Sequence, residues 1–172
     1  MRKRVELAAI ATFVWLIGAH TSWAQKYDDK EHAELAKALK GVKVSLEKGL
    51  SASESQGKPI SGKFEVEDGK LLLSVYTMKG DKFSEVIVDH KTGKLAKAEA
   101  ITGGEDLTAA KAQSGAMAKA KLSLQAATEK AVKANKGYRA VSVIPTLKEG
   151  HPVADVTLVK GNEFKTVSDK LD

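Results

Sequence analysis

Cysteine is absent from the 172-residue chain. No disulfide can therefore stabilise the fold, and thiol catalysis, a thiolate metal site and a lipid-modified cysteine are all excluded. Aromatic residues make up only 5% of the chain, which argues against a platform of stacked aromatic rings for RNA. A small domain with this composition must be held together by its hydrophobic core alone.

The chain also lacks the motifs of the common catalytic and metal sites. It has no Gly-x-Ser-x-Gly elbow, and Gly103-Gly104 is not followed by the Lys-Ser or Lys-Thr pair of a phosphate-binding loop. Its histidines outside the first 24 residues have no partner at the i, i+4 spacing of helical metal sites. These residues are His32, His90 and His151. We therefore expect no catalytic residue, no metal and no cofactor.

Acidic and basic residues are interspersed along the chain, which carries a formal net charge of +6. This mixture predicts a solvated surface and no binding of nucleic acid. Glu65 and Glu67 fall on the polar side of a predicted strand, where charged side chains discourage unwanted pairing. A hydrolase would instead need two carboxyl groups in a sheltered cleft, which this pattern does not indicate.

Residues 1–24 have the three parts of a secretory signal peptide. A basic start is followed by an apolar run over residues 7–18, and Ser22 and Ala24 supply small side chains before a cut at Gln25. The apolar run is shorter than the roughly 18 residues that a membrane-spanning helix needs. We expect a periplasmic or secreted protein with no stable membrane anchor after cleavage.

Three strands are predicted between residues 60 and 95. Glycine-containing turns at Gly69 and Gly80 separate runs rich in Val, Leu, Ile and Phe, which is a strong hairpin signal. The middle run, residues 71–78, is apolar on both faces, as a central strand would be. Polar residues 89–93 then turn the chain.

Helices are predicted on both sides of these strands. Ala33, Leu35 and Leu39 have helical spacing before Gly41, and Ser45 can cap a helix over residues 46–56. Residues 99–121 are rich in Ala, Gly and Lys, and we interpret them as a partly helical connector with little apolar surface to bury.

The second half of the chain has the same rhythm as the first. Ser123 can cap a helix over residues 124–134, and strands are predicted from residue 138 to residue 168. An offset of 81 residues places matching residues at turns and core positions, which indicates an internal repeat. The pairs are Gly69 and Gly150, Val75 and Val156, Gly80 and Gly161, Phe83 and Phe164, and Val86 and Val167.

The repeated unit resembles the PepSY domain, a family named for its occurrence in propeptides of peptidases. The likeness is greatest where an apolar strand leads into Asp89, two variable residues, Thr92, Gly93 and Lys94. Residues 122–172 match the helix and strands but lack the Thr-Gly turn, as a degenerate copy would. The segments that carry the resemblance are residues 45–46, 64–66, 73–75, 80, 83–86 and 88–95.

The resemblance implies an α+β fold made of two repeats, each a helix followed by a three-stranded antiparallel sheet with the helices packed on one sheet face. It divides the chain into a signal peptide (1–24), an N-terminal helix with the first PepSY-like unit (25–98), the Ala-rich connector (99–121) and the degenerate unit (122–172). It implies no catalytic residues, and Asp89, Thr92 and Gly93 match the motif as residues that build a turn.

Two functions follow as hypotheses. In the first, the exported, non-catalytic protein binds a protein or peptide partner at a strand edge and modulates or inhibits a peptidase, with Tyr76, Met78, Phe83 and Phe164 as candidate anchors. In the alternative, lysine-rich faces bind small or anionic ligands, and such binding would weaken with salt. The lysines considered are Lys111, Lys119, Lys121, Lys130 and Lys133.

Overall fold

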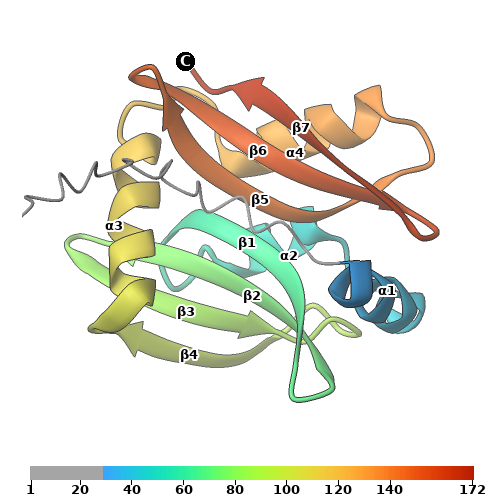
Figure 1. The fold of residues 1–172 in the computed structure, drawn as a ribbon. Coiled ribbons are helices and arrows are strands. Elements are labelled where there is room, and N and C mark those ends of the chain that lie inside the picture. The colour runs from blue at the N-terminus through green and yellow to red at the C-terminus, as the bar shows by residue number, and fades with distance from the viewer. Residues whose placement is uncertain (1–28) are drawn as a thin grey trace, which may run out of the picture.

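The computed structural model describes residues 29–172 as one seven-stranded antiparallel sheet with four α-helices (Figure 1). The predicted signal peptide, residues 1–24, lies outside the described residues. The strands are β1 (Lys58–Glu67), β2 (Lys70–Lys79), β3 (Lys82–Val88), β4 (Leu95–Ile101), β5 (Arg139–Lys148), β6 (His151–Lys160) and β7 (Glu163–Lys170). The helices are α1 (Asp29–Ala38), α2 (Leu46–Ser53), α3 (Gly104–Met117) and α4 (Leu124–Ala134), with a 3₁₀ turn, η1 (Leu39–Gly41), after α1.

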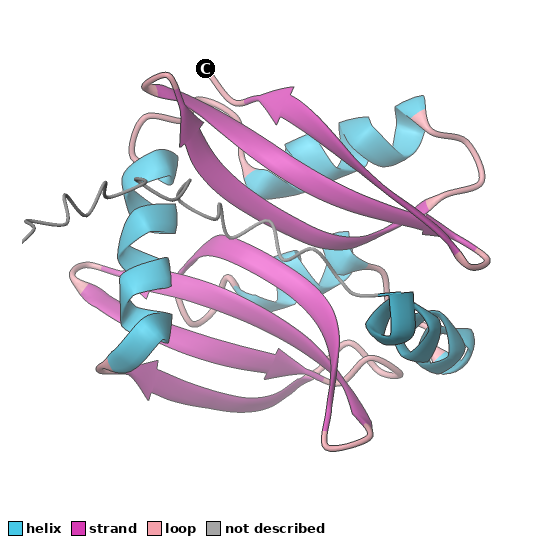
Figure 2. Ribbon diagram, viewed as in Figure 1, coloured by secondary structure: helices cyan, strands magenta, loops and turns pink. Residues whose placement is uncertain are grey.

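The predicted fold class is wrong in its sheet. Two repeats with separate three-stranded sheets were expected, but the strands form a single sheet in the order β4-β3-β2-β1-β5-β6-β7 (Figure 2). The halves join where β1 pairs with β5, at Gly62 with Val143 and Lys63 with Ser142. Joining two sheets in this way pairs backbone N–H and C=O groups that would otherwise be left at two open edges. Hydrophobic alternation gives the faces of a strand but not its neighbours, so the sequence pattern did not predict the joint.

The expectation that the helices pack on one sheet face is also wrong. Helices α2 and α4 lie behind the sheet in Figure 1, whereas α3 crosses in front of it. On the α2 side, a Cβ atom built on Gly49 would lie 2.6 Å from Leu73 Cδ2, so helix and strand are in close contact. On the other side, Tyr76 reaches Asp106 of α3. The Ala-rich connector, residues 99–121, therefore contains the end of strand β4 and helix α3, which covers the second face.

The N-termini of α2 and α4 have the serine caps that the sequence predicted. The Ser45 hydroxyl oxygen accepts a hydrogen bond from the Lys48 N–H at 3.3 Å, and the Ser123 hydroxyl oxygen accepts one from the Ala126 N–H at 3.1 Å. Each cap satisfies an N–H group that has no partner within its own helix.

Matching backbone hydrogen bonds fix the start of each of these helices against the sheet. Two consecutive N–H groups just before Ser45 donate to the His90 carbonyl at 3.0 and 3.1 Å. Two consecutive N–H groups just before Ser123 donate to the Leu171 carbonyl at 2.7 and 3.0 Å. His90 and Leu171 are separated by the same 81-residue offset as the paired glycines, so the two halves correspond locally although they share one sheet.

Helix α1 lies at the end of the sheet where β1 and β5 diverge, and it contacts β1 and β2 (Figure 1). Leu35 and Leu39 are buried there. The His32 ring stacks on Phe164 of β7 with the ring centroids 4.2 Å apart. The helix therefore contacts strands from both halves of the sheet.

The core lies mainly between the sheet and the helices α2 and α4. Its largest fully buried side chains include Phe64, Leu46, Leu50, Leu73 and Leu124. Burying a side chain of this size stabilises the fold by about 1.5–3 kcal/mol relative to leaving it exposed. The opposite face is more polar, and the candidate site lies there.

Candidate functional site

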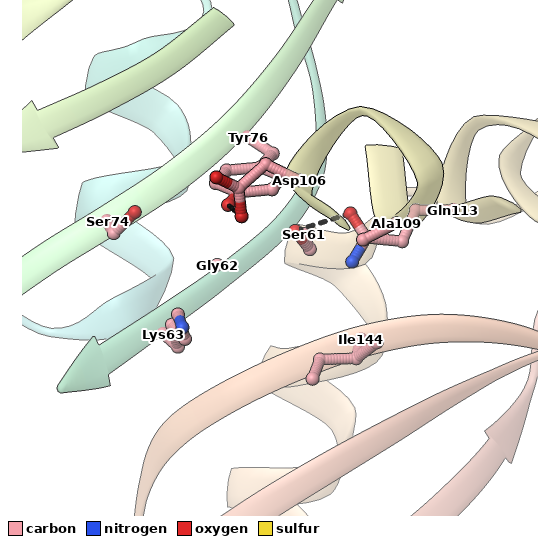
Figure 3. Close-up of a pocket in the computed structure, with 9 residues that line it drawn as sticks. All are labelled: Ser61, Gly62, Lys63, Ser74, Tyr76, Asp106, Ala109, Gln113 and Ile144. Carbon is pink, nitrogen blue, oxygen red and sulfur yellow. Dashed lines mark hydrogen bonds between the residues drawn. The ribbon is translucent and has the colours of Figure 1, made fainter. Parts of the chain in front are cut away.

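A pocket of about 240 Å³ lies between α3 and the sheet, beside the joint of β1 and β5. Strands β1 and β2 form its floor, α3 forms one wall, and Ile144 of β5 borders it (Figure 3). Its polar side chains come from segments far apart in the sequence. The residues that matter for its chemistry are Ser61, Ser74, Tyr76, Asp106, Ala109 and Gln113.

Tyr76 and Asp106 form one end of the pocket. The Tyr76 hydroxyl donates a hydrogen bond of 2.8 Å to Asp106 Oδ1. Burial, followed by this hydrogen bond to a carboxylate, raises the pKa of Tyr76 above its ordinary value of 10.0. The phenol therefore keeps its proton at neutral pH and holds the Asp106 side chain in place.

Two serine hydroxyls are buried in the pocket floor. The Ser61 hydroxyl donates to Gln113 Oε1 at 2.8 Å, and the Ser74 hydroxyl donates to Glu85 Oε1. Ser61 and Gln113 are each 8% exposed and Ser74 is 1% exposed. Buried polar groups are costly unless they are hydrogen-bonded, so these pairs keep a polar floor in an otherwise apolar fold.

The raised pKa of Tyr76 predicts a change in stability at alkaline pH. Because the phenol is harder to ionise in the folded than in the unfolded protein, its contribution is complete below pH 10.0 and is lost as pH rises through the folded-state pKa. As pH rises from 10.0 toward the folded-state pKa, the free energy of unfolding should therefore fall more steeply in wild type than in Tyr76→Phe. Urea denaturation at about pH 9 and pH 11 measures this difference. Both proteins keep Tyr138, which controls for its own raised pKa. A gap between them that stayed constant with pH would contradict the prediction.

A second, more open hollow of about 390 Å³ adjoins this pocket on the β4 side. Asp106 borders both, and Glu85 and Glu99 add two more carboxylates. Glu99 forms an ion pair with Lys97 at 2.8 Å. No group of three His, Asp or Glu side chains within residues 29–172 is arranged to hold a metal ion.

The four predicted anchors lie in different surroundings. Tyr76 lines the pocket, and the Met78 sulfur accepts a hydrogen bond of 2.8 Å from the Ser114 hydroxyl of α3. Phe83 is only 9% exposed, and Phe164 is stacked on His32. The structure therefore does not gather these residues into one surface, and of the four only Tyr76 lines the pocket beneath α3.

The predicted turn residues form a compact loop between β3 and β4. Asp89 Oδ1 accepts hydrogen bonds from the N–H groups of Lys91 at 2.9 Å and Thr92 at 2.7 Å, and these lower the pKa of Asp89. Gly93 has φ 75°, a backbone conformation that glycine adopts without strain. All three motif residues thus have a structural place in this turn.

The lysines of the alternative hypothesis are spread over separate elements. Lys111 is on α3 and Lys133 on α4, which cover opposite faces of the sheet. The ammonium group of Lys130 pairs with Asp169 at 2.7 Å, and that of Lys119 donates to the Gly150 carbonyl at 3.3 Å. Lys121 is exposed between α3 and α4. These positions do not form a continuous basic surface.

Sequence reasoning missed Ser61, Asp106 and Gln113 as pocket residues. Asp106 and Gln113 are seven positions apart, so they lie on one side of a helix. The other residues on this side of α3 are mostly alanine. Two polar residues within such an apolar stripe were the one feature of the sequence that could have indicated a polar site. Its meaning depended on α3 crossing the sheet, which the pattern did not show.

Within the described part of the chain, no helix has the length and apolar character needed to cross a bilayer. No protein-family model and no curated protein matches this chain. Among solved structures, the crystal structure of a putative lipoprotein from Clostridium difficile 630 is similar over 76% of this chain and 88% of that chain. The TM-score is 0.43 and the sequence identity is 13%. A similarity of this degree assigns the chain neither a family nor a function.

Proposed function

We propose that this protein is an exported, non-catalytic module that binds an extended segment of a protein partner along strand β4. The supporting observation is the exposure of this edge strand, in which every residue except Ile101 is exposed. One side of β4 pairs with β3, and no described strand pairs with the other side. An unpaired edge offers backbone N–H and C=O groups to an added strand.

The composition of β4 suits this role. Ala96, Ala98 and Ala100 alternate along it, and their small side chains leave the backbone accessible. Two of the seven residues of β4 are charged, Lys97 and Glu99, against four of the eight residues of β7, the opposite edge, where Asp169 is held by Lys130 of α4. Charged side chains hinder the pairing of an edge strand, so β4 is the better docking edge.

The cellular part of the proposal comes from the sequence. Residues 1–24 have the pattern of a cleaved signal peptide, so the module would act in the periplasm or outside the cell. A peptidase is the partner class implied by the PepSY resemblance. An inhibition assay with exported peptidases tests this narrower proposal separately from strand addition.

The absence of cysteine allows a direct test of the docking edge. Extended peptides selected from a displayed library on the mature protein would be added to two single-cysteine variants, Ala98→Cys on β4 and Thr166→Cys on β7. Both original residues are exposed, which makes the second variant a matched control. We expect bound peptide to slow thiol alkylation at position 98 by about tenfold or more and to leave position 166 unchanged, because an added strand covers its neighbour.

Equal protection at both positions, or protection at position 166 alone, would rule out β4 as the docking edge. Failure to select any peptide that binds the folded protein would count against strand addition itself. Binding that persists from low to moderate salt is expected for backbone pairing, whereas a purely electrostatic contact with the lysines would weaken.

A further inference from the structure

The pocket beneath α3 exists because the helix presents only a small side chain there. Ala109 faces it from the helix, and Gly62 contributes only backbone to its floor, because a Cβ atom at position 62 would point toward Leu50 and Leu46 of α2. The space that remains between helix and sheet is about 240 Å³ and is partly open to solvent. A larger residue at position 109 would fill it.

Gln113 places an unused hydrogen-bond donor in this space. The side chain is 8% exposed, and its Oε1 accepts the hydrogen bond from Ser61. Its Nε2 has no hydrogen-bond partner within the described residues. In Figure 3 this nitrogen faces the space between Ser61 and Ile144. The amide nitrogen is not among the fully buried unpaired atoms, so it is accessible from the pocket and can donate to a ligand that brings an acceptor, such as a carbonyl oxygen.

The other polar groups of the pocket favour a ligand that donates hydrogen bonds. The hydroxyls of Ser61, Ser74 and Tyr76 all donate to protein acceptors, which leaves lone pairs on their oxygens for a ligand. Asp106 and the adjoining Glu85 are acidic. An ammonium group placed beside Asp106 would satisfy these acceptors and the negative charge.

The one basic side chain of the pocket does not offset this charge. Lys63 forms an ion pair with Glu65, so its ammonium group is matched by a carboxylate of its own strand. The local field at the Tyr76 and Asp106 end is therefore negative. The Gln113 end is neutral and presents a donor.

We propose that this pocket binds an α-amino group together with a nearby carbonyl oxygen, as carried by a free amino acid or by the first residues of a peptide. The ammonium group would bind at Asp106 and the Tyr76 oxygen, and the carbonyl oxygen would accept from Gln113 Nε2. The volume is below the roughly 300–1,000 Å³ of typical ligand pockets, which suits one or two small residues. This site lies under α3 and does not require strand addition at β4.

Calorimetric titration of the mature protein tests the proposal with three kinds of probe: L-alanine, the dipeptide Ala-Ala and N-acetyl-Ala-Ala. We expect acetylation to weaken binding at least tenfold, because it removes the positive charge. Saturable binding of L-alanine would identify a free amino acid as the ligand, and binding of the dipeptide alone would identify a peptide N-terminus. Failure of both to bind, or equal binding of the acetylated dipeptide, would overturn the proposal.

Two pairs of variants locate the binding. Asp106→Asn removes one charge at an exposed position and should weaken binding about tenfold or more, whereas Glu105→Gln on the same helix should not.

Ala109→Leu should block the pocket, whereas Ala112→Leu on the exposed side of α3 should leave affinity unchanged. Asp106→Asn keeps the test valid if Ala109→Leu disturbs folding. If probe binding survived unchanged in Asp106→Asn, the pocket would not be the site. These titrations are independent of the labelling of β4, so either proposal can fail alone.

Discussion

Replacing Leu171 by alanine is expected to lower the free energy of unfolding by about 2–5 kcal/mol, although the residue is next to the last in the chain. Its side chain is fully buried. Its carbonyl accepts the two N–H groups that precede the Ser123 cap, and its own N–H donates to the Pro152 carbonyl at 2.9 Å. The substitution leaves a cavity at the point where the chain end is fixed to α4 and β6.

Urea denaturation of the purified variant measures this loss. Leu147→Ala is the matched control, because the same substitution there removes a side chain that is 45% exposed. Its cost should be no more than about 1 kcal/mol, as only part of the side chain leaves water on folding. Equal losses in the two variants would show that the C-terminal residues are not packed in the core.

Replacing Gly62 by leucine is expected to weaken the joint between the halves of the sheet. A Cβ atom at this position would lie 3.0 Å from Leu50 Cδ2 and 3.4 Å from Leu46 Cδ1. A leucine must therefore displace α2 or push β1 away from β5. Overpacking of this kind costs about 1–3 kcal/mol, and the loss of a residue pair at the joint would add to it.

Hydrogen exchange separates a local opening of this joint from a general loss of stability. Neighbouring N–H groups of a strand point to opposite sides, so in Gly62→Leu the one of the Ser142 and Val143 amide groups that faces β1 should exchange faster than those of the β6–β7 hairpin. Gly115→Ala is the control, because nothing lies within 4 Å of a Cβ atom at that position in α3. It should stabilise the protein by about 0.4–1 kcal/mol. Wild-type exchange at the joint in Gly62→Leu would contradict the prediction.

The local elements of this fold could be predicted because each has a chemical signal of its own. Ser45 and Ser123 accept hydrogen bonds from helix N–H groups, and both caps were identified from the sequence. Gly69 and Gly80 have φ values of 73° and 65°, which glycine adopts at low cost, and both turns were predicted. Signals of this kind act within a few residues.

The sequence contains no such local signal for strand β4 or for the pairing of β1 with β5. An edge strand that is exposed on both faces need not alternate between apolar and polar residues, and the alanines of β4 favour a helix on intrinsic propensity. The pairing of β1 with β5 depends on residues about 80 positions apart. Tyr76 was identified as a candidate because it is a large side chain on a strand, but its partners on α3 became apparent only in the three-dimensional arrangement.

The joint also makes the sheet mechanically uneven. Within each half, neighbouring strands pair along most of their length, whereas the halves pair at only two positions. Resistance to bending should therefore be lowest along the line between β1 and β5, and the softest collective motion should be a rotation of one half against the other. Helix α3 contacts strands of both halves, and the pocket lies against this line. The width of the pocket should therefore change with the angle between the two halves of the sheet.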